Sequence, residues 1–146
     1  MTSTKTSTSL ESGNVGTVQE FVARFSAAWK RPNVDVVRGL MHADTRNLIP
    51  PMTQAADRES VLAHFAEVIK KVPDLSLDIR RWAHSGDTVM IEWNAIATVR
   101  GNSLAWTGVD IMRLRGDKIS ELQSYWDTKR LSAKIETALL NGDSSA

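Results

Sequence analysis

Hydrophobic residues change their spacing once along this chain, near residue 75. Before that point they recur every three or four positions, as on one face of a helix. After it they alternate with polar residues, as in a strand. The sequence Thr17-Val18-Gln19-Glu20 is a capping box and predicts the start of a first helix, which Pro32 ends. Asn33 and Asp57 are expected to cap a short second helix and a longer third helix, which ends before Pro73.

Alternating residues predict four long strands, joined by short connections rich in glycine, asparagine and aspartate that are typical of hairpins. These strands are expected at 75–84, 88–99, 103–115 and 118–127. A short strand at 45–49, ended by Pro50-Pro51, precedes the third helix. Helices followed by a meander predict an α+β fold, with the three N-terminal helices covering the concave face of a strongly curved, cone-shaped antiparallel sheet.

The 146 residues are expected to form one domain, because the chain is too short for two sizeable cores. Residues 1–14 are rich in serine and threonine and contain too few apolar groups to bury, so they are expected to be a disordered leader. The folded domain is expected over residues 15–130. Residues 131–146 are expected to be a partly helical tail.

Composition and charge exclude several classes of function. Lys and Arg number 18 and Asp and Glu number 17, a net charge of +1 that predicts no binding to nucleic acid or to a membrane surface. The chain has no cysteine, which excludes thiolate chemistry and suits a cytoplasmic location. His42 is expected at a helix end and His84 beside a hairpin turn, and no two histidines have metal-ligand spacing. Neither a metal nor another cofactor is expected.

Strand parity predicts which residues face the concave side of the sheet. The face of strand 88–99 that carries Trp93 is apolar, and the face of strand 103–115 that carries Asp110 lacks the two terminal arginines. Together with the helices, these faces predict an apolar pocket for a small organic molecule. The apolar residues expected to line it are Phe25, Trp29, Phe65, Val68, Trp93, Trp106, Met112 and Trp126. A tryptophan-rich core without a ligand is the alternative.

Asp110 is the exception on this apolar face. A buried carboxylate is costly unless it is paired, hydrogen-bonded or neutral. Gly108, one pleat away, is expected to leave room beside the carboxyl group, which favours a functional role. A structural role, in a salt bridge or bonded to backbone N–H groups, is equally open. Asn47 and Ser124 are the other polar residues expected at the pocket wall.

The stretch WTGVDIMRLRGDKISELQSYWD, residues 106–127, resembles the closing hairpin of the SnoaL-like polyketide cyclases and of the ketosteroid isomerases. Both families belong to the nuclear transport factor 2-like superfamily. The helix that ends in Trp29, the helix start Asp57-Arg58-Glu59 and the hairpin at 86–93 resemble the same superfamily. The resemblance covers about residues 15 to 130, and it implies the cone-shaped, cystatin-like fold.

The resemblance carries over to this chain only in part. Asp110 matches the neutral carboxylic acid in the oxyanion hole of the isomerases, and it also matches the acid–base aspartate of the cyclases. The isomerase tyrosines are replaced here by Phe25, Met41 and Phe65, and its general base by Ile49 before Pro50. Limonene epoxide hydrolases share the fold, but their catalytic arginine and carboxylates are matched by Trp93, Ala95 and Ser124. Neither ordinary steroid isomerisation nor epoxide hydrolysis is therefore expected.

Two functions remain open. The first is a cofactor-independent isomerase, cyclase or lyase acting on a polyketide-, steroid- or terpenoid-like carbonyl compound. Asp110 would be its acid or base, Asn47 and Ser124 would orient the substrate, and His64 is a candidate proton-transfer partner. The second is a ligand-binding or accessory protein of the same fold. In either case the convex face of the sheet is expected to form a homodimer through Met90, Ile96, Val109 and Ile111.

Overall fold

The computed structural model describes residues 2–142, with side chains for residues 15–141. In chain order the elements are α1 (Thr2–Lys30), α2 (Val34–Arg38), β1 (Met41–Leu48), α3 (Arg58–Lys71), β2 (Ser76–Ser85), β3 (Thr88–Val99), β4 (Asn102–Arg115), β5 (Lys118–Tyr125) and α4 (Thr128–Gly142). The ends of the four long strands agree with the alternating pattern to within two residues. The predicted α+β class is confirmed.

Two of the three predicted helix starts are confirmed by their caps. Asn33 Oδ1 accepts a hydrogen bond of 2.9 Å from the backbone N–H of Val36, and Asp57 Oδ1 accepts one of 2.8 Å from that of Ser60. The predicted start of α1 at Thr17 is wrong, because α1 already begins at Thr2. A capping box marks a helix end only where the preceding residues leave helical geometry, and here they continue the helix.

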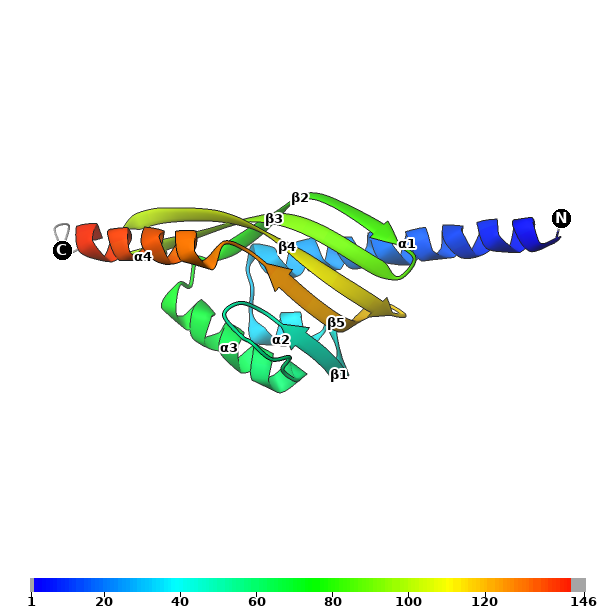
Figure 1. Ribbon diagram of the computed structural model, residues 1–146, viewed down its shortest axis with the longest axis horizontal. Coiled ribbons are helices and arrows are strands. Elements are labelled where there is room, and N and C mark those ends of the chain that lie inside the picture. The colour runs from blue at the N-terminus through cyan, green and yellow to red at the C-terminus, as the bar shows by residue number, and fades with distance from the viewer. Residues whose placement is uncertain (1, 143–146) are drawn as a thin grey trace.

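The first part of α1 extends past the end of the sheet (Figure 1). The side chains of residues 1–14 lie outside the described residues, and the separation of this segment from a domain at 15–130 stays a prediction. Residues 143–146 of the expected tail also lie outside them. The described part of that tail is the helix α4, which begins three residues before the expected tail.

The strands form one sheet in the order β1-β5-β4-β3-β2. Neighbours from β2 to β5 are antiparallel, as expected, whereas β1 pairs with β5 in parallel, with Asn47 opposite Leu122. β1 begins at Met41, so the prediction of a strand at 45–49 is wrong at its start. The partners of β1 lie about 75 residues later in the chain, so local sequence does not set its length.

The concave face of the sheet packs against the helices (Figure 1). Phe21 of α1, Val61 and Leu62 of α3, and Val89 and Ile91 of β3 are almost completely buried between the layers. α1 contacts β2 and α3 contacts β1, while α4 packs against β3 and β4. This arrangement confirms the predicted curved sheet with helices on its concave side, and adds α4 as a fourth covering element.

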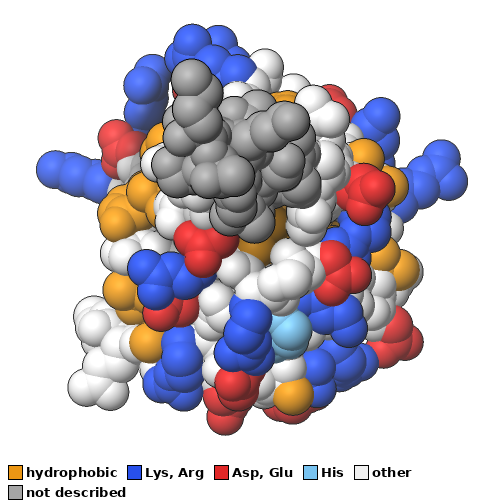
Figure 2. All heavy atoms as spheres, turned by 90° about the vertical axis from the view of Figure 1, so that its right-hand side faces the viewer, with side chains coloured by type: hydrophobic (Ala, Val, Ile, Leu, Met, Phe, Trp, Pro, Cys, Tyr) orange, Lys and Arg blue, Asp and Glu red, His pale blue; other side chains and the backbone are white. Residues whose placement is uncertain are grey.

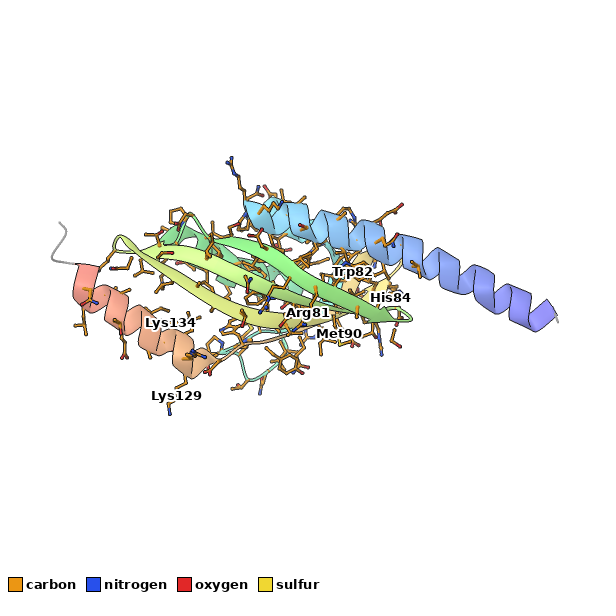
Figure 3. The ribbon with its side chains drawn as sticks, turned by 90° about the horizontal axis from the view of Figure 1, so that it is seen from above. Arg81, Trp82, His84, Met90, Lys129 and Lys134 are labelled. Atoms are coloured by element: carbon orange, nitrogen blue, oxygen red, sulfur yellow. The ribbon has the colours of Figure 1, made fainter. Side chains whose placement is uncertain are left out.

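The outer face of the sheet is partly apolar. Met90 and Ile96 are 42% and 48% exposed, and Arg81 bonds Glu92 beside them. Figure 3 looks onto this face and shows Arg81 close to Met90. At the end of the molecule from which α1 extends, basic and acidic side chains are intermingled (Figure 2). Within residues 2–142, no helix is long and apolar enough to cross a membrane.

Candidate functional site

A cavity of about 350 Å³ lies between the concave face of the sheet and the helices. Most of the residues predicted at its wall do line it, namely Phe25, Trp29, Phe65, Val68, Trp93, Trp106, Trp126, His64, Asp110 and Ser124. Asn47 and Met112 do not, although both are completely buried. The predicted apolar pocket is therefore present, and its size suits a drug-sized organic molecule.

Aromatic rings form two groups along the cavity wall. Trp29 of α1 meets Phe65 of α3 edge to face, with centroids 5.2 Å apart, and Phe25 lies 6.3 Å from Trp29. On the sheet side, Trp93 of β3 and Trp126, just beyond β5, are 5.8 Å apart in a T-shaped arrangement. Such edge-to-face pairs stabilise the positions of the rings in addition to their burial.

Asp110 is held at this wall by a cross-strand partner. Asp110 of β4 lies opposite Ser124 of β5, and the Ser124 hydroxyl donates a hydrogen bond of 2.7 Å to Asp110 Oδ1. Both side chains are buried, each with 7% of its surface exposed. No Lys, Arg or His among the described residues forms an ion pair with Asp110. The alternative of a structural salt bridge is thus absent from the described part of the chain.

Burial raises the pKa of Asp110 to about 6, from a usual value of 3.8, because the charged form loses its hydration. The Ser124 hydroxyl and the indole N–H of Trp93 act in the opposite direction, since both favour the ionised carboxylate. Desolvation is the largest of the three effects. Asp110 therefore changes its charge close to neutral pH.

Gly108 has a different role from the one expected. Trp93 and Gly108 are cross-strand partners, and a Cβ atom at position 108 would lie 2.4 Å from Cζ2 and 2.5 Å from Cη2 of the indole. The space at Gly108 is therefore filled by the Trp93 ring, so the expectation that Gly108 leaves room beside the carboxyl group is wrong. Glycine is required here because the ring lies directly on the strand backbone.

The indole N–H of Trp93 is buried and has no hydrogen-bond partner of normal geometry among the described residues. A buried donor without an acceptor costs about 1–3 kcal/mol. The Asp110 carboxyl group is near enough for this N–H to lower its pKa. An unsatisfied donor and a desolvated acid thus lie side by side at the cavity wall.

Asn47 holds a loop in place rather than facing the cavity. Its backbone exchanges two hydrogen bonds with Ala56, of 2.9 and 2.7 Å, and its side-chain amide donates to the Ala56 carbonyl at 3.2 Å. Thr45 Oγ1 lies 3.4 Å from Asn47 Oδ1 and donates to it. The expectation that Asn47 lies at the pocket wall is not met, because these bonds direct its side chain to the loop before α3.

The three histidines occupy different environments. His42 lies on β1, where Nε2 is 2.6 Å from the carbonyl oxygen of Arg115, so its expected place at a helix end is wrong. His84 Nδ1 is 3.2 Å from the carbonyl oxygen of Gly86, at the predicted hairpin turn. Of the three, only His64 lines the cavity. Among the described residues, no three acidic or histidine side chains form a cluster suited to a metal ion.

One face of α4 also lines the cavity, which sequence reasoning missed. Thr128, Leu131, Ser132 and Ile135 lie on this face. Asp127 Oδ1 caps the helix by accepting a hydrogen bond of 2.9 Å from the backbone N–H of Arg130. In the sequence, the four-residue spacing of Leu131 and Ile135 is the pattern that indicates this apolar helical face.

Ile49 and Phe25, which match the base and the tyrosine of the isomerases, line the cavity as apolar groups.

The model of a family described as "SnoaL-like domain" matches residues 22–122, which is more than half of the chain. The chain belongs to the SnoaL-like domain family. The resemblance stated from residues 106–127 is therefore confirmed at the level of the family. No curated protein matches the sequence significantly.

Solved structures share the fold of this SnoaL-like domain. A protein with a ketosteroid isomerase-like fold from Catenulispora acidiphila, in complex with trimethylamine, is 22% identical with a TM-score of 0.71, covering 80% of this chain and 92% of that one. A proposed SnoaL-like polyketide cyclase from Jannaschia sp. is 19% identical, with a TM-score of 0.69 and coverages of 84% and 91%. IdmH, a proposed polyketide cyclase from Streptomyces antibioticus, is 19% identical, with a TM-score of 0.70 and coverages of 81% and 97%. Identities this low establish a common fold only.

The first prediction concerns the contact between Trp93 and Gly108. In Gly108→Ala the new methyl group would meet the indole and, at 2.9 Å, the backbone oxygen of Tyr125, so the free energy of unfolding should fall by about 2–3 kcal/mol. Gly16→Ala is the matched control, because it lies in α1 with no atom within 4 Å of the added Cβ. It should be neutral or stabilise by up to ~1 kcal/mol. Urea denaturation measures both, and an unchanged midpoint for Gly108→Ala would contradict the packing described.

The second prediction concerns the ionisation of Asp110. Its folded pKa of about 6 exceeds the unfolded value of 3.8, so its contribution to stability is complete below pH 3.8 and is lost as the pH rises through 6. Asparagine does not ionise and can still accept the Ser124 hydrogen bond. The stability of Asp110→Asn relative to the wild type should therefore increase by about 3 kcal/mol between pH 3.5 and 7.5. Denaturation across this range checks the value, and a difference independent of pH would show that Asp110 is not desolvated.

Proposed function

We propose that this SnoaL-like domain is a cofactor-independent isomerase, cyclase or lyase that acts by acid–base catalysis on a hydrophobic carbonyl compound of polyketide, steroid or terpenoid type. The observation that carries the proposal is one carboxyl group, Asp110, buried at the wall of a nearly apolar cavity. Desolvation brings the pKa of such a group close to the pH at which it exchanges a proton with a substrate. The proposed polyketide cyclases of the same fold support this class of reaction.

Asp110 acts as the base in this proposal. With a pKa of about 6 it is mostly ionised at pH 7, yet it is more basic than an exposed aspartate. Ser124 holds Oδ1, while Oδ2 has no normal hydrogen bond to any described residue. The fixed oxygen orients the carboxyl group, and the other is left for the substrate.

The proposed step begins with a C–H bond next to the substrate carbonyl. Asp110 takes the proton, and the electron pair of that bond moves to the carbonyl oxygen to form an enolate. In a cyclisation the enolate carbon then attacks a second carbonyl carbon of the same molecule, and the new alkoxide takes up a proton. His64, which lines the cavity from α3, is the candidate group that supplies this proton. The aromatic walls limit access of water to the enolate.

Binding without turnover is the second candidate function. Among the described lining residues, Asp110 and His64 are the only ones with titratable side chains. The positions that match the base and tyrosine of the isomerases, Ile49 and Phe25, are apolar. A cavity with so few proton-transfer groups also suits a protein that carries or presents a hydrophobic compound.

We further propose that the outer face of the sheet binds a second copy of this chain. Met90, Ile96 and Tyr125 are 42–48% exposed on this face, and Val109 and Ile111 lie between them on β4. Two ion pairs join neighbouring strands of the sheet, Arg81–Glu92 between β2 and β3 and Arg113–Glu121 between β4 and β5. A face that carries both signs of charge around an apolar centre can pair with itself about a two-fold axis.

The third prediction tests proton transfer by Asp110. Exchange of the α-protons of 2-tetralone, a bicyclic ketone, in D₂O should be accelerated by the wild type, with a rate that rises through pH 6 and then levels off. Asp110→Asn should lower the rate by at least about 100-fold, because it removes the base. Proton NMR measures the exchange. Asp78→Asn, an exposed carboxylate on β2, is the matched control and should keep the full rate.

Binding of the same ketone separates the two candidate functions. Trp29, Trp93, Trp106 and Trp126 all line the cavity, so quenching of tryptophan fluorescence should report occupancy in the wild type and in Asp110→Asn. Equal exchange rates in the two proteins would exclude Asp110 as the base. Quenching by the wild type without any acceleration of exchange would favour the ligand-binding function.

The fourth prediction concerns the dimer. Sedimentation velocity at micromolar concentration should give about twice the chain mass of 16.2 kDa. Met90→Lys should give a monomer, because it places a charge at the apolar centre of the proposed interface. Leu140→Lys changes a side chain that is 80% exposed on α4, and should remain a dimer. A wild-type monomer would refute the interface.

A further inference from the structure

One face of α4 forms a cavity wall that the SnoaL-like family match does not include. The match ends at residue 122, whereas α4 runs from Thr128 to Gly142. Thr128, Leu131, Ser132 and Ile135 all line the cavity. Their spacing of three, four and seven residues places them on one helical face. This face therefore presents two hydroxyl groups and two aliphatic side chains to a bound molecule.

Specific hydrogen bonds fix α4 against the sheet. Lys134 Nζ donates a hydrogen bond of 2.7 Å to the carbonyl oxygen of Ala105, and Asn102 Nδ2 donates one of 3.2 Å to that of Ala138. Ala138 is buried. Figure 3 shows Lys134 on the side of α4 next to the sheet and Lys129 pointing away from it. The helix therefore has a defined position over the start of β4.

The far end of the α4 wall lies well away from Asp110, whereas its first residue, Thr128, follows Ser124 by only four residues. Leu104, Trp106 and Asp110 of β4 all line the cavity, so the cavity follows at least six residues of this strand, or about 20 Å. α4 bonds the strand at Ala105, five residues from Asp110, which is about 17 Å along it. A small ligand at Asp110 would not reach Ile135, the neighbour of Lys134, whereas an elongated one would.

We propose that α4 sets the length of the ligand that the cavity accepts. The ligand is an elongated carbonyl compound, either a fused multi-ring system or a long polyketide-like chain. Its carbonyl lies at Asp110, and its far end packs against Leu131 and Ile135. The hydroxyl groups of Thr128 and Ser132 lie between these two ends, and accept or donate a hydrogen bond at an oxygen along the ligand. The position of the carbonyl end rests on the proposed function, but the contact with α4 does not.

Three aryl methyl ketones of increasing length test whether α4 sets the ligand length, namely acetophenone, 2-acetylnaphthalene and 2-acetylphenanthrene. Their dissociation constants are measured by quenching of tryptophan fluorescence. In the wild type the three-ring ketone should bind at least ten-fold more tightly than the one-ring ketone. Ile135→Phe enlarges a side chain at the α4 wall, so it should weaken binding of the three-ring ketone at least ten-fold and leave the one-ring ketone unchanged.

Leu139→Phe is the matched control, because Leu139 lies on the same helix, is 41% exposed and does not line the cavity. It should bind all three ketones as the wild type does. Ile135→Ala is a second variant that removes the contact without adding bulk, and it should weaken the three-ring ketone several-fold and leave the one-ring ketone unchanged. Equal effects of Ile135→Phe on all three ketones, or no effect on any, would overturn the proposal that α4 sets the ligand length. Failure of the wild type to bind any of them would overturn it as well.

Asp110→Asn separates this inference from the proposed catalysis. This variant should lose proton exchange and keep the preference for the three-ring ketone, because the α4 wall is unchanged. If the wild type selects ketones by length but never exchanges their protons, the catalytic function is refuted and length selection by α4 is supported. If the wild type binds all three ketones with equal affinity and exchanges their protons, length selection by α4 is refuted and the catalytic function is supported.

Discussion

The contact between the Trp93 indole and the bare backbone at Gly108 sets the chemistry of the cavity wall. With any side chain at position 108 the ring would be displaced, since a Cβ atom there would lie 2.4 Å from it. In its observed place the ring covers β4 one pleat from Asp110 and meets Trp126 edge to face. The same ring therefore shapes the apolar wall, removes water from the carboxyl group and supplies the N–H that partly offsets that desolvation. The character of Asp110 depends on this one contact more than on any charge nearby.

This arrangement costs stability in two places. The carboxyl group of Asp110 must either stay neutral or ionise without a counter-ion, and the N–H of Trp93 has no normal hydrogen bond among the described residues. Two such costs side by side are uncommon in a core that serves packing alone, where buried polar groups are nearly always satisfied. Isosteric apolar residues would form a more stable wall. That the chain keeps the polar groups is the physical argument for a role in binding or proton transfer.

The sequence predicted the features that depend on neighbouring residues, and it did not predict those that depend on contacts between distant parts of the chain. The caps at Asn33 and Asp57 and the period of two in β2–β5 depend on neighbouring residues, and they were predicted correctly. Parity also placed Asp110 and Ser124 on the inner face, but it does not give the direction of a ring. The space at Gly108 was therefore expected to be open, whereas Trp93 fills it. Asn47 has inward parity too, yet its partner is Ala56, in a loop whose path the sequence did not reveal. The parallel pairing of β1 with β5 was missed for the same reason.

The positions of Asp110 and α4 suggest how one fold can combine a fixed reaction with a variable substrate. Asp110 and the Trp93–Gly108 contact lie within the matched SnoaL-like region, on strands whose register is set by paired hydrogen bonds. Changes there alter the burial of the acid and the packing of the sheet together. Hydrogen bonds from one lysine and one asparagine join α4 to the sheet, and its inner face lines the cavity, so residues on that face can change without disturbing a strand. Substitutions on α4 are therefore the less costly route to a new ligand, because they change the shape of the cavity while the environment of the carboxyl group stays the same.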